Sequence, residues 1–525
     1  MSNHNPESCK PLGNTDGQLS AAEYLRQILL APVGEVAVVT PLSDMPRLST
    51  RLQNTVSIKR EDRQPVHSYK LRGAYNKLVN LSAEQKAAGV VAASAGNHAQ
   101  GVVYSARRLG IDATIVMPET TPEIKVEAVR ALGGNVVLHG AAFDDAGAEA
   151  RRLSEEKGWT MIPPFDDPDV IAGQGTLAKE LLQQNPELDT VFVPVGGGGL
   201  LAGVAVYLKQ MRPDIKIVGV ESDGSACFAA ALEAGKLVDL EHVGVFADGV
   251  AVKRMGEETY RLAKEYTDEV VQVDVDQLCA AIKDIFEDTR AIAEPAGAVA
   301  LAGLKKHQQM HGYSGRNLAA ILSGSNLNFH TLRYISERCE LGERREALLA
   351  VKIPERKGSF RQFCGAMGGR AITEFNYRYV PDAEAHIFVG VQLQDADREL
   401  PALKQELESQ DYWVDDYSDN ELAKLHVRYM MGGSPKGLQN ERLYNFEVPE
   451  SPGSLMRFLE VLGDKWNISL FHFRNHGASV GQALAGIEVP DEEMGEFIEH
   501  LERLGYIYTD ESNNPAYGMF LASRQ

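Results

Sequence analysis

The sequence lacks any apolar run long enough to cross a membrane, since no stretch approaches the about 18 residues that a spanning helix needs. Its first residues, MSNHNPESCKPLGNTDG, are polar and contain no apolar segment of the kind found in a secretion signal. Cysteine is also scarce: the chain has 5 cysteines, none in CxxC spacing, which does not predict a disulfide framework. We therefore expect a cytoplasmic protein with no membrane partner, whose residues 1–20 are flexible.

Basic residues are in short supply as well. The chain carries 53 Lys and Arg against 73 Asp and Glu, a formal net charge of −20. Nucleic acids and anionic membranes attract basic surfaces, so neither is expected as the main partner. At 525 residues the chain exceeds what one hydrophobic core usually serves, which predicts several domains.

Short β-branched segments alternate with helical segments over roughly the first two thirds of the chain. This alternation is typical of parallel sheets with helices on both faces, and it predicts an α/β fold. The expected strands lie at 55–59, 89–94, 113–118, 135–140, 189–195, 216–222, 269–274 and 317–324. Ligands of such folds bind at loops that follow the carboxyl ends of the strands.

The C-terminal part of the chain is internally duplicated. Residues 348–378 align with residues 443–474, so that Pro354 matches Pro449, and Phe363 matches Phe458. Gly358 and Gly453 also fall in register, as do Ser359 and Ser454, and Arg378 and Arg474. Each copy predicts a βαββαβ unit. The preceding segment SERCELGERREA (336–347) is interpreted as a charged linker.

The segment PVGGGGLLAG (194–203) follows an expected strand and opens an expected helix. Consecutive glycines leave backbone N–H groups open, and a helix N-terminus favours an anion, so the loop predicts a phosphate site. Gly197, Gly199 and Ala202 also satisfy the GxGxxG/A pattern, with Glu221 about twenty residues later, so a dinucleotide site is an alternative. A glycine turn needed only for close helix–strand packing is a third interpretation.

Three further segments carry candidate site residues. SAGNHAQG (94–101) offers hydroxyl, amide and open N–H donors between a strand and a helix, which suits a carboxylate or a polar ring substituent. Lys70 in SYKLRGAY lies at the expected start of a helix, where an acid is usual because the positive end of the helix dipole repels a cation. Ser323 in ILSGSN (321–326) ends a strand, and its hydroxyl could bind a ring nitrogen. Taken singly, each of these features also has an ordinary structural explanation: a helix cap, a surface lysine and a turn serine.

A phosphate loop, an amine and a hydroxyl together suit pyridoxal phosphate. In their order along the chain, SYKLRGA, SAGNHAQG, GGGGL and ILSGSN resemble the fold type II pyridoxal phosphate enzymes, most closely the serine/threonine dehydratase branch. With its duplicated tail, the chain is similar to the biosynthetic threonine dehydratase family, whose tails carry two ACT-like regulatory domains of α+β, ferredoxin-like fold. The resemblance implies a catalytic domain at 21–335 and ACT-like domains at 347–419 and 442–513.

The same resemblance implies roles for individual residues. Lys70 would form the Schiff base and act as general base, Asn97 would contact the 3′-oxygen of the ring, and Ser323 would face the ring nitrogen. The phosphate would be held by Gly196, Gly197, Gly198, Gly199 and Leu200. The substrate carboxylate would be contacted by Ser94, Ala95, Gly96 and His98.

The implied reaction is conversion of L-threonine, with L-serine as a secondary substrate, to 2-oxobutanoate and ammonia in isoleucine biosynthesis. Isoleucine would inhibit and valine would oppose it through the tail, and the family implies a homotetramer and no metal. The alternatives are a serine-preferring dehydratase or racemase of the same fold, an NAD-binding protein with no role for Lys70, and an inactive amino-acid sensor. The duplicated tail argues against the first, and intact Lys70, Asn97 and Ser323 argue against the last.

Overall fold

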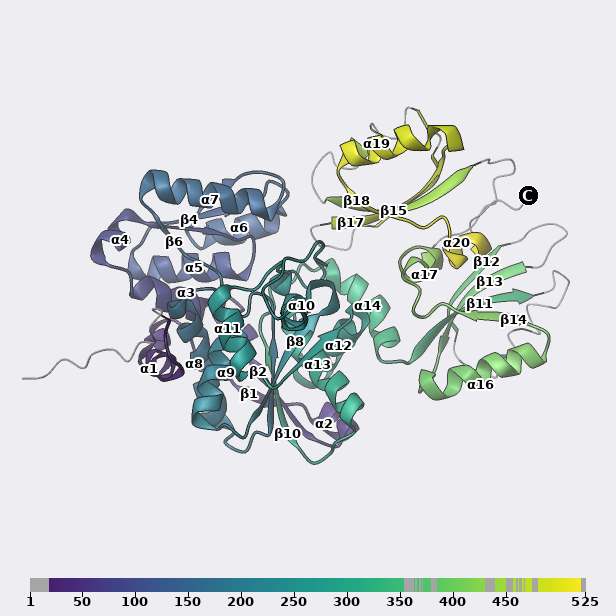
Figure 1. Cartoon of the computed structure of the whole chain (residues 1–525). Coiled ribbons are helices and arrows are strands. Elements are labelled where there is room, and N and C mark those ends of the chain that lie inside the picture. The colour runs from purple at the N-terminus through teal and green to yellow at the C-terminus, as the bar shows by residue number, and fades with distance from the viewer. Residues whose placement is uncertain are drawn as a thin grey trace, which may run out of the picture. The chain divides into compact units, whose positions relative to one another are not determined.

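The chain forms two compact units, Met1–Leu327 and Asn328–Gln525, drawn in Figure 1. The computed structural model describes residues 18–353, 363, 366–367, 370, 372–378, 385–429, 440–449, 457–458, 461, 465–466, 468–474 and 480–520. Most of the segment expected to be flexible, residues 1–17, lies outside this range, as do Pro354, Gly358, Ser359, Gly453 and Ser454 of the repeat. The first described helix, α1 (Ala21–Leu30), begins at a capping box in which Ser20 and Glu23 bind each other's backbone N–H groups.

The larger sheet of the first unit has six strands in the order β1-β2-β10-β7-β8-β9. All neighbouring strands are parallel except β1, which runs antiparallel to β2 at the edge. The strands are β1 (Leu42–Asp44), β2 (Thr55–Arg60), β7 (Thr190–Pro194), β8 (Lys216–Ser222), β9 (Glu269–Val273) and β10 (Asn317–Leu322). Every strand expected from the pattern in this region is present, and β1 is an addition too short for alternation to reveal.

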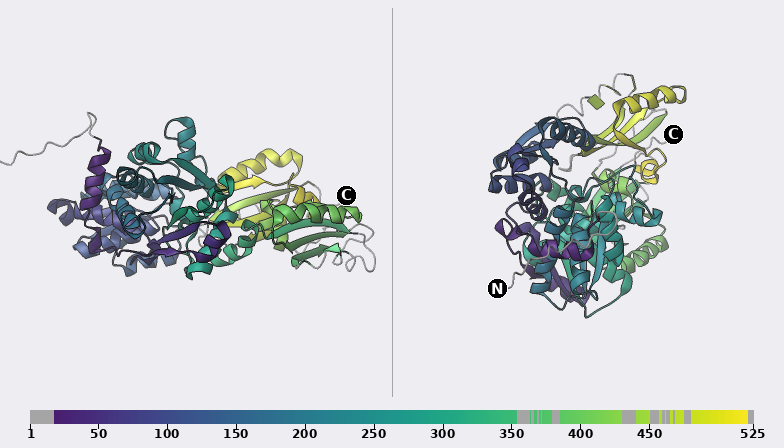
Figure 2. Two further views of the ribbon diagram at one scale, coloured as in Figure 1. Left: turned by 90° about the horizontal axis from the view of Figure 1, so that it is seen from below. Right: turned by 60° about the vertical axis from the view of Figure 1, so that its left-hand side comes forward.

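The smaller sheet of the first unit has four parallel strands in the order β5-β4-β3-β6. They are β3 (Val90–Ala93), β4 (Ala113–Met117), β5 (Asn135–Leu138) and β6 (Thr160–Met161). The two sheets belong to separate lobes, each flanked by its own helices (Figure 1; Figure 2, right). The expectation of two parallel-sheet α/β subdomains is therefore confirmed.

Helices cover the sheets of the first unit. Four helices that frame the site are α3 (Lys70–Val79), α5 (Asn97–Leu109), α8 (Pro168–Gln184) and α9 (Gly199–Met211). The others are α2 (Pro46–Leu52), α4 (Ala83–Ala88), α6 (Glu123–Ala131), α7 (Phe143–Lys157), α10 (Cys227–Ala234), α11 (Glu257–Tyr266), α12 (Val275–Thr289) and α13 (Pro295–His311). One hydrophobic core joins α8 and α9 to β7, β8 and β10, so the loops at the carboxyl ends of these strands are held on a rigid support.

The second unit contains two four-stranded antiparallel sheets with the same order, β12-β13-β11-β14 and β16-β17-β15-β18. The first holds β11 (Glu346–Ile353), β12 (Ile372–Arg378), β13 (Ala385–Gln392), α16 (Ala396–Ser409) and β14 (Trp413–Asp416). The second holds β15 (Glu441–Pro449), β16 (Ile468–Arg474), β17 (Val480–Glu488), α19 (Met494–Leu504) and β18 (Ile507–Asp510). In Figure 1, α16 and α19 each cover one face of their sheet, and their apolar residues join the strand cores. The α+β expectation for this region is confirmed.

The segment 336–347 is not the linker that its charges indicated. Most of it belongs to α14 (Thr331–Gly342), and its last residues begin β11. Ile335 and Cys339, one helical turn apart, are buried, whereas Glu337, Glu340 and Glu343 are partly exposed. Charges arranged around a buried stripe stabilise a surface helix, and the charge content hid that stripe from the composition-based interpretation. Among the described helices, none is both long and apolar enough to span a bilayer.

Candidate active site

Lys70 is the first residue of α3, and that helix begins without a side-chain cap. The backbone N–H of Tyr69 instead donates to the carbonyl oxygen of Ser323 at 3.2 Å. Ser68 forms an isolated antiparallel bridge with Gly324 beside it. The segments SYKLRGAY and ILSGSN, distant in sequence, are thus joined by backbone contacts, and Lys70 lies next to the end of β10.

The Lys70 side chain is half-buried, and its Nζ lies 3.4 Å from the carbonyl oxygen of Pro164. Pro164 belongs to the loop 162–165 that follows β6. The same loop accepts a hydrogen bond from His98 through the carbonyl oxygen of Ile162, with Nε2 at 2.9 Å. This loop therefore contacts both the candidate amine and the SAGNHAQG segment.

The glycine loop lies against the next residue of that loop, Phe165. A Cβ on Gly197 would lie 2.1 Å from Phe165 Cδ1, and one on Gly199 would lie 3.1 Å from the Phe165 backbone. Gly198 has a φ of +90°, a conformation that L side chains rarely adopt. Close packing and backbone conformation thus both require glycine here.

The backbone N–H groups of the glycine loop favour the binding of an anion. Gly197 to Leu200 are buried residues, and in the described part of the chain no hydrogen bond joins their backbone N–H groups to a protein acceptor. These N–H groups lie at the positive N-terminus of the 13-residue helix α9. The loop therefore fits the phosphate group of a cofactor.

Asn97 is the first residue of α5, and both ends of its side-chain amide are engaged. Its Nδ2 donates to Glu294 Oε1 at 2.6 Å, and its Oδ1 accepts from Asn326 Nδ2 at 2.7 Å. Because Glu294 offers an oxygen acceptor and Asn326 an N–H donor, these contacts determine the orientation of the Asn97 amide. Among the described residues the second N–H of Nδ2 meets no acceptor, so it can donate to a ligand.

Ser94, Ala95 and Gly96 connect β3 to α5. The Ser94 hydroxyl is buried and accepts from the Gly96 N–H at 3.3 Å. His98 is buried too, and burial lowers its pKa to about 4, with the nearby Lys70 charge acting in the same direction. His98 is therefore a neutral imidazole at pH 7.

Ser323 lies in the turn after β10 with its hydroxyl buried. That hydroxyl donates to the carbonyl oxygen of Ala296 at 3.2 Å. Nearby, the Ser68 hydroxyl is buried and has no hydrogen-bond partner among the described residues. A buried hydroxyl without a partner is a group that a polar ligand could satisfy.

Glu294, absent from the sequence predictions, lies at the centre of this region. Its carboxyl is buried, and it precedes Pro295 at the start of α13. Burial raises the pKa of Glu294 to about 7, and the charge of Asp248 adds to the increase. Lys125 pairs with Asp248 at 2.6 Å and works against this shift. The carboxyl can therefore gain or lose a proton near neutral pH.

Other contacts that sequence reasoning missed are those of Pro164, Phe165, Ser68 and Asn326. Pro163 and Pro164 form a Pro-Pro step directly after β6, and that step was the available signal for a loop. Nothing in the local sequence connects Glu294 to Asn97, because that contact exists only after the chain has folded.

The dinucleotide alternative is wrong. Its acidic residue, Glu221, accepts from the backbone N–H groups of Phe228 at 2.7 Å and Ala229 at 2.8 Å. Glu221 is fully buried and binds the start of α10, so its carboxylate is not presented to a ribose.

Comparison with protein families supports the pyridoxal phosphate interpretation over the dinucleotide one. Residues 35–324 match the family described as pyridoxal-phosphate dependent enzyme. Residues 337–427 and 432–521 each match the C-terminal regulatory domain of threonine dehydratase. The two matched regulatory segments correspond to the two antiparallel sheets.

Similar proteins extend over nearly the whole chain. The L-threonine dehydratase biosynthetic IlvA of Escherichia coli (strain K12) is 60% identical over 506 residues, covering 96% of this chain and 98% of that protein. The mitochondrial threonine dehydratase of Saccharomyces cerevisiae is 48% identical, covering 95% of this chain and 89% of that protein. The structure of the processed form of threonine deaminase isoform 2 from Solanum lycopersicum has a TM-score of 0.61 and 49% identity, covering 63% of this chain and 90% of that one.

Proposed function

The chain belongs to the biosynthetic threonine dehydratases, a family of pyridoxal-phosphate dependent enzymes, and we propose that its reaction is carried out at the site around Lys70. The reaction converts L-threonine to 2-oxobutanoate and ammonia. One observation supports this location most strongly: the start of α3 at Lys70, the Ser323 turn and the loop 162–165 meet at the carboxyl ends of parallel strands.

The cofactor would be held by groups from four segments. Lys70 would bind it covalently through Nζ, and the N–H groups of Gly197 to Leu200, together with Gly196, would hold its phosphate. Asn97 would contact the 3′-oxygen of its ring, and Ser323 would contact its ring nitrogen. Bound there, pyridoxal phosphate supplies an electron sink for the charge left when a proton leaves the substrate α-carbon.

Protein residues would transfer the α-proton, bind the substrate carboxylate and orient the loop. The Lys70 amine would take the α-proton as general base. The substrate carboxylate would lie at the segment from Ser94 to His98, where the helix start of α5 and the open N–H groups favour an anion. Neutral His98 would orient this loop through its Nε2–H bond to Ile162, because an imidazole with so low a pKa lacks the second, acidic proton of an imidazolium at neutral pH.

Lys70→Ala tests this assignment. We expect the variant to fold, to form no 2-oxobutanoate and to lose the cofactor's visible absorption. Borohydride reduction of the wild-type holoenzyme should fix the cofactor to the peptide that contains Lys70, as read by mass spectrometry. Lys77→Ala, which changes a lysine of the same helix that pairs with Asp167, is the control and should retain activity. Cofactor fixed to another lysine would disprove the assignment.

The C-terminal unit is regulatory, and we propose that isoleucine inhibits and valine relieves inhibition by binding to it. L-serine would be a secondary substrate, and the assembly would be a homotetramer. Isoleucine suits the role of an inhibitor because the product, 2-oxobutanoate, supplies carbon to that amino acid.

A further inference from the structure

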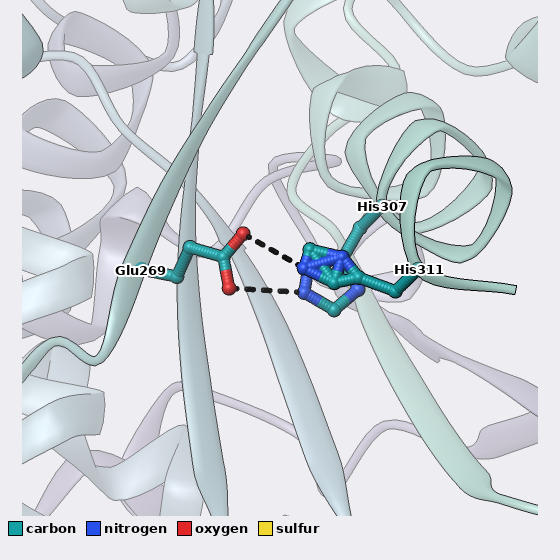
Figure 3. A group of neighbouring side chains, drawn as sticks. All are labelled: Glu269, His307 and His311. Carbon is teal, nitrogen blue, oxygen red and sulfur yellow. Dashed lines mark hydrogen bonds and ion pairs between the residues drawn. The ribbon is translucent and has the colours of Figure 1, made fainter. Parts of the chain in front are cut away.

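A group of ligand atoms gathers at the amino-terminal edge of the six-stranded sheet. Glu269 is the first residue of β9, and His307 and His311 lie one turn apart at the end of α13 (Figure 3). His307 Nε2 lies 3.2 Å from Glu269 Oε2, and His311 Nε2 lies 3.5 Å from Glu269 Oε1. All three ligand atoms lie within 4.8 Å of one another.

These separations suit a small metal ion. A tetrahedral Zn²⁺ with bonds of about 2.1 Å places its ligand atoms about 3.4 Å apart. The two Glu269–histidine distances are close to that value, although each ends on a different oxygen of the carboxylate. The imidazole rings are stacked, with centroids 4.2 Å apart and planes inclined by 21°. Binding therefore requires the His311 ring to turn, and His311 can do so because its side chain is 35% exposed.

The contacts of His307 suit a metal ligand in one of its two tautomers. His307 Nε2 lies 3.2 Å from both Lys216 Nζ, which can only donate, and Glu269 Oε2, which can only accept. With the hydrogen on Nδ1, that nitrogen donates to the Tyr313 hydroxyl at 2.8 Å and the Nε2 lone pair is available to a metal ion. A partner on the second ring nitrogen is how proteins orient a metal-binding histidine.

Lys216 shows that this position already attracts a cation. Its Nζ also lies 2.6 Å from Glu269 Oε2, so one ammonium lies beside both the carboxylate and His307 Nε2. The carboxyl end of α13, which ends at His311, adds its partial negative charge. The Lys216 side chain is 37% exposed and has room to turn into solvent.

We propose that Glu269, His307 and His311 bind a divalent transition metal ion of the Zn²⁺ class in exchange for the Lys216 ammonium. Two imidazole nitrogens and one carboxylate oxygen, with water as the fourth ligand, select Zn²⁺ and its neighbours over Mg²⁺ or Ca²⁺, which prefer oxygen ligands. The site is separate from the cofactor site, because β8 and β9 begin here, whereas Lys70 and the glycine loop lie where the parallel strands end. It takes no part in the dehydratase reaction.

Calorimetric titration of the holoenzyme, freed of excess cofactor, with Zn²⁺ tests the proposal. We expect one Zn²⁺ bound per chain at this cluster, and His311→Ala should weaken that binding by at least about tenfold. His242→Ala removes an exposed histidine outside the cluster and should leave binding unchanged. Equal Zn²⁺ binding by wild type and His311→Ala would overturn the proposal.

Lys216→Met is the complementary variant, since it removes the competing cation while retaining a similar side-chain length. It should bind Zn²⁺ more tightly than wild type, which a merely misfolded variant would not do. Unchanged or weaker binding would show that the ammonium and the metal ion do not share one position, and the exchange would be disproved.

Discussion

Glu294 shows how one buried carboxyl can hold a neighbouring side chain at the candidate site. It accepts the hydrogen bond that orients Asn97, and its N–H donates to the carbonyl oxygen of Gly324 at 3.3 Å. A Cβ on Gly324 would lie 2.4 Å from Glu294 Oε1. The glycine of ILSGSN is thus required by the packing of a residue that the motif does not contain.

Glu294→Gln should change how stability depends on pH. Burial raises the pKa of Glu294 to about 7, above its unfolded value, so the folded state favours the protonated carboxyl. Its contribution to stability is complete below the unfolded pKa and is lost as pH rises through about 7. Glutamine keeps the acceptor for Asn97 but cannot ionise. The variant should therefore gain stability relative to wild type between pH 5 and pH 8, by up to roughly 3 kcal/mol.

Free energies of unfolding at several pH values, obtained from denaturant titrations of wild type and variant, measure this difference. Burial also raises the pKa of Glu221 to about 7, but Glu221 is present in both proteins, so its contribution cancels. A difference between the two proteins that does not change with pH would contradict the raised pKa of Glu294.

At the scale of whole elements, the close packing of α8 against α9 depends on glycines. A Cβ on Gly203 would lie 2.4 Å from the carbonyl oxygen of Ile171 and 2.7 Å from the backbone nitrogen of Gly175. These atoms are backbone and cannot move aside without separating the helices. Because α9 begins at the glycine loop, its packing against α8 also determines the position of the N–H groups proposed to bind phosphate.

Gly203→Ala should therefore lower the free energy of unfolding by about 1–3 kcal/mol, as overpacking does in other cores, and weaken cofactor binding. Gly147→Ala in α7 is the matched control. There a Cβ would meet only the Arg151 guanidinium at 3.7 Å, an ordinary contact, so alanine should stabilise the helix by about 0.5–1 kcal/mol. Equal effects of the two substitutions would rule out the packing argument.

The elements differ in how far sequence could predict them. The helix start at Lys70 and the parallel strands were correctly expected, because apolar spacing and β-branched segments are local signals. The edge strand β1 and the two-residue β6 were missed because three or fewer residues carry no alternation. In 336–347, abundant charge obscured the buried stripe of α14.

The residues of the candidate site also differ in how far the sequence could predict them. Lys70, Asn97, the glycine loop and Ser323 lie in motifs that can be identified one at a time. Glu294, Pro164 and Asn326 acquire their roles only from contacts across long sequence separations, such as the one between Asn326 and Asn97. No periodicity in a single sequence reports such contacts.

The molecule as a whole places catalysis and regulation in separate units. The candidate site lies within Met1–Leu327, whereas both antiparallel sheets lie within Asn328–Gln525. An effector bound to the second unit can change the reaction only if it binds more tightly to one state of the protein than to another. The proposed isoleucine control can therefore be tested in two ways: by the effect of isoleucine on the threonine reaction, and by the effect of a substrate analogue on isoleucine binding.

We expect isoleucine to shift the threonine saturation curve to higher concentration, roughly 5- to 150-fold, the usual range of coupling between distant sites. Initial rates of 2-oxobutanoate formation by the full-length holoenzyme measure the shift, with valine reversing it and D-isoleucine as the inactive control. Linkage requires that a substrate analogue lacking the β-hydroxyl weaken isoleucine binding by the same factor, which calorimetry measures. If isoleucine bound to the protein but left the threonine curve unchanged, its role as an inhibitor would be disproved, and the regulatory unit would require a different ligand.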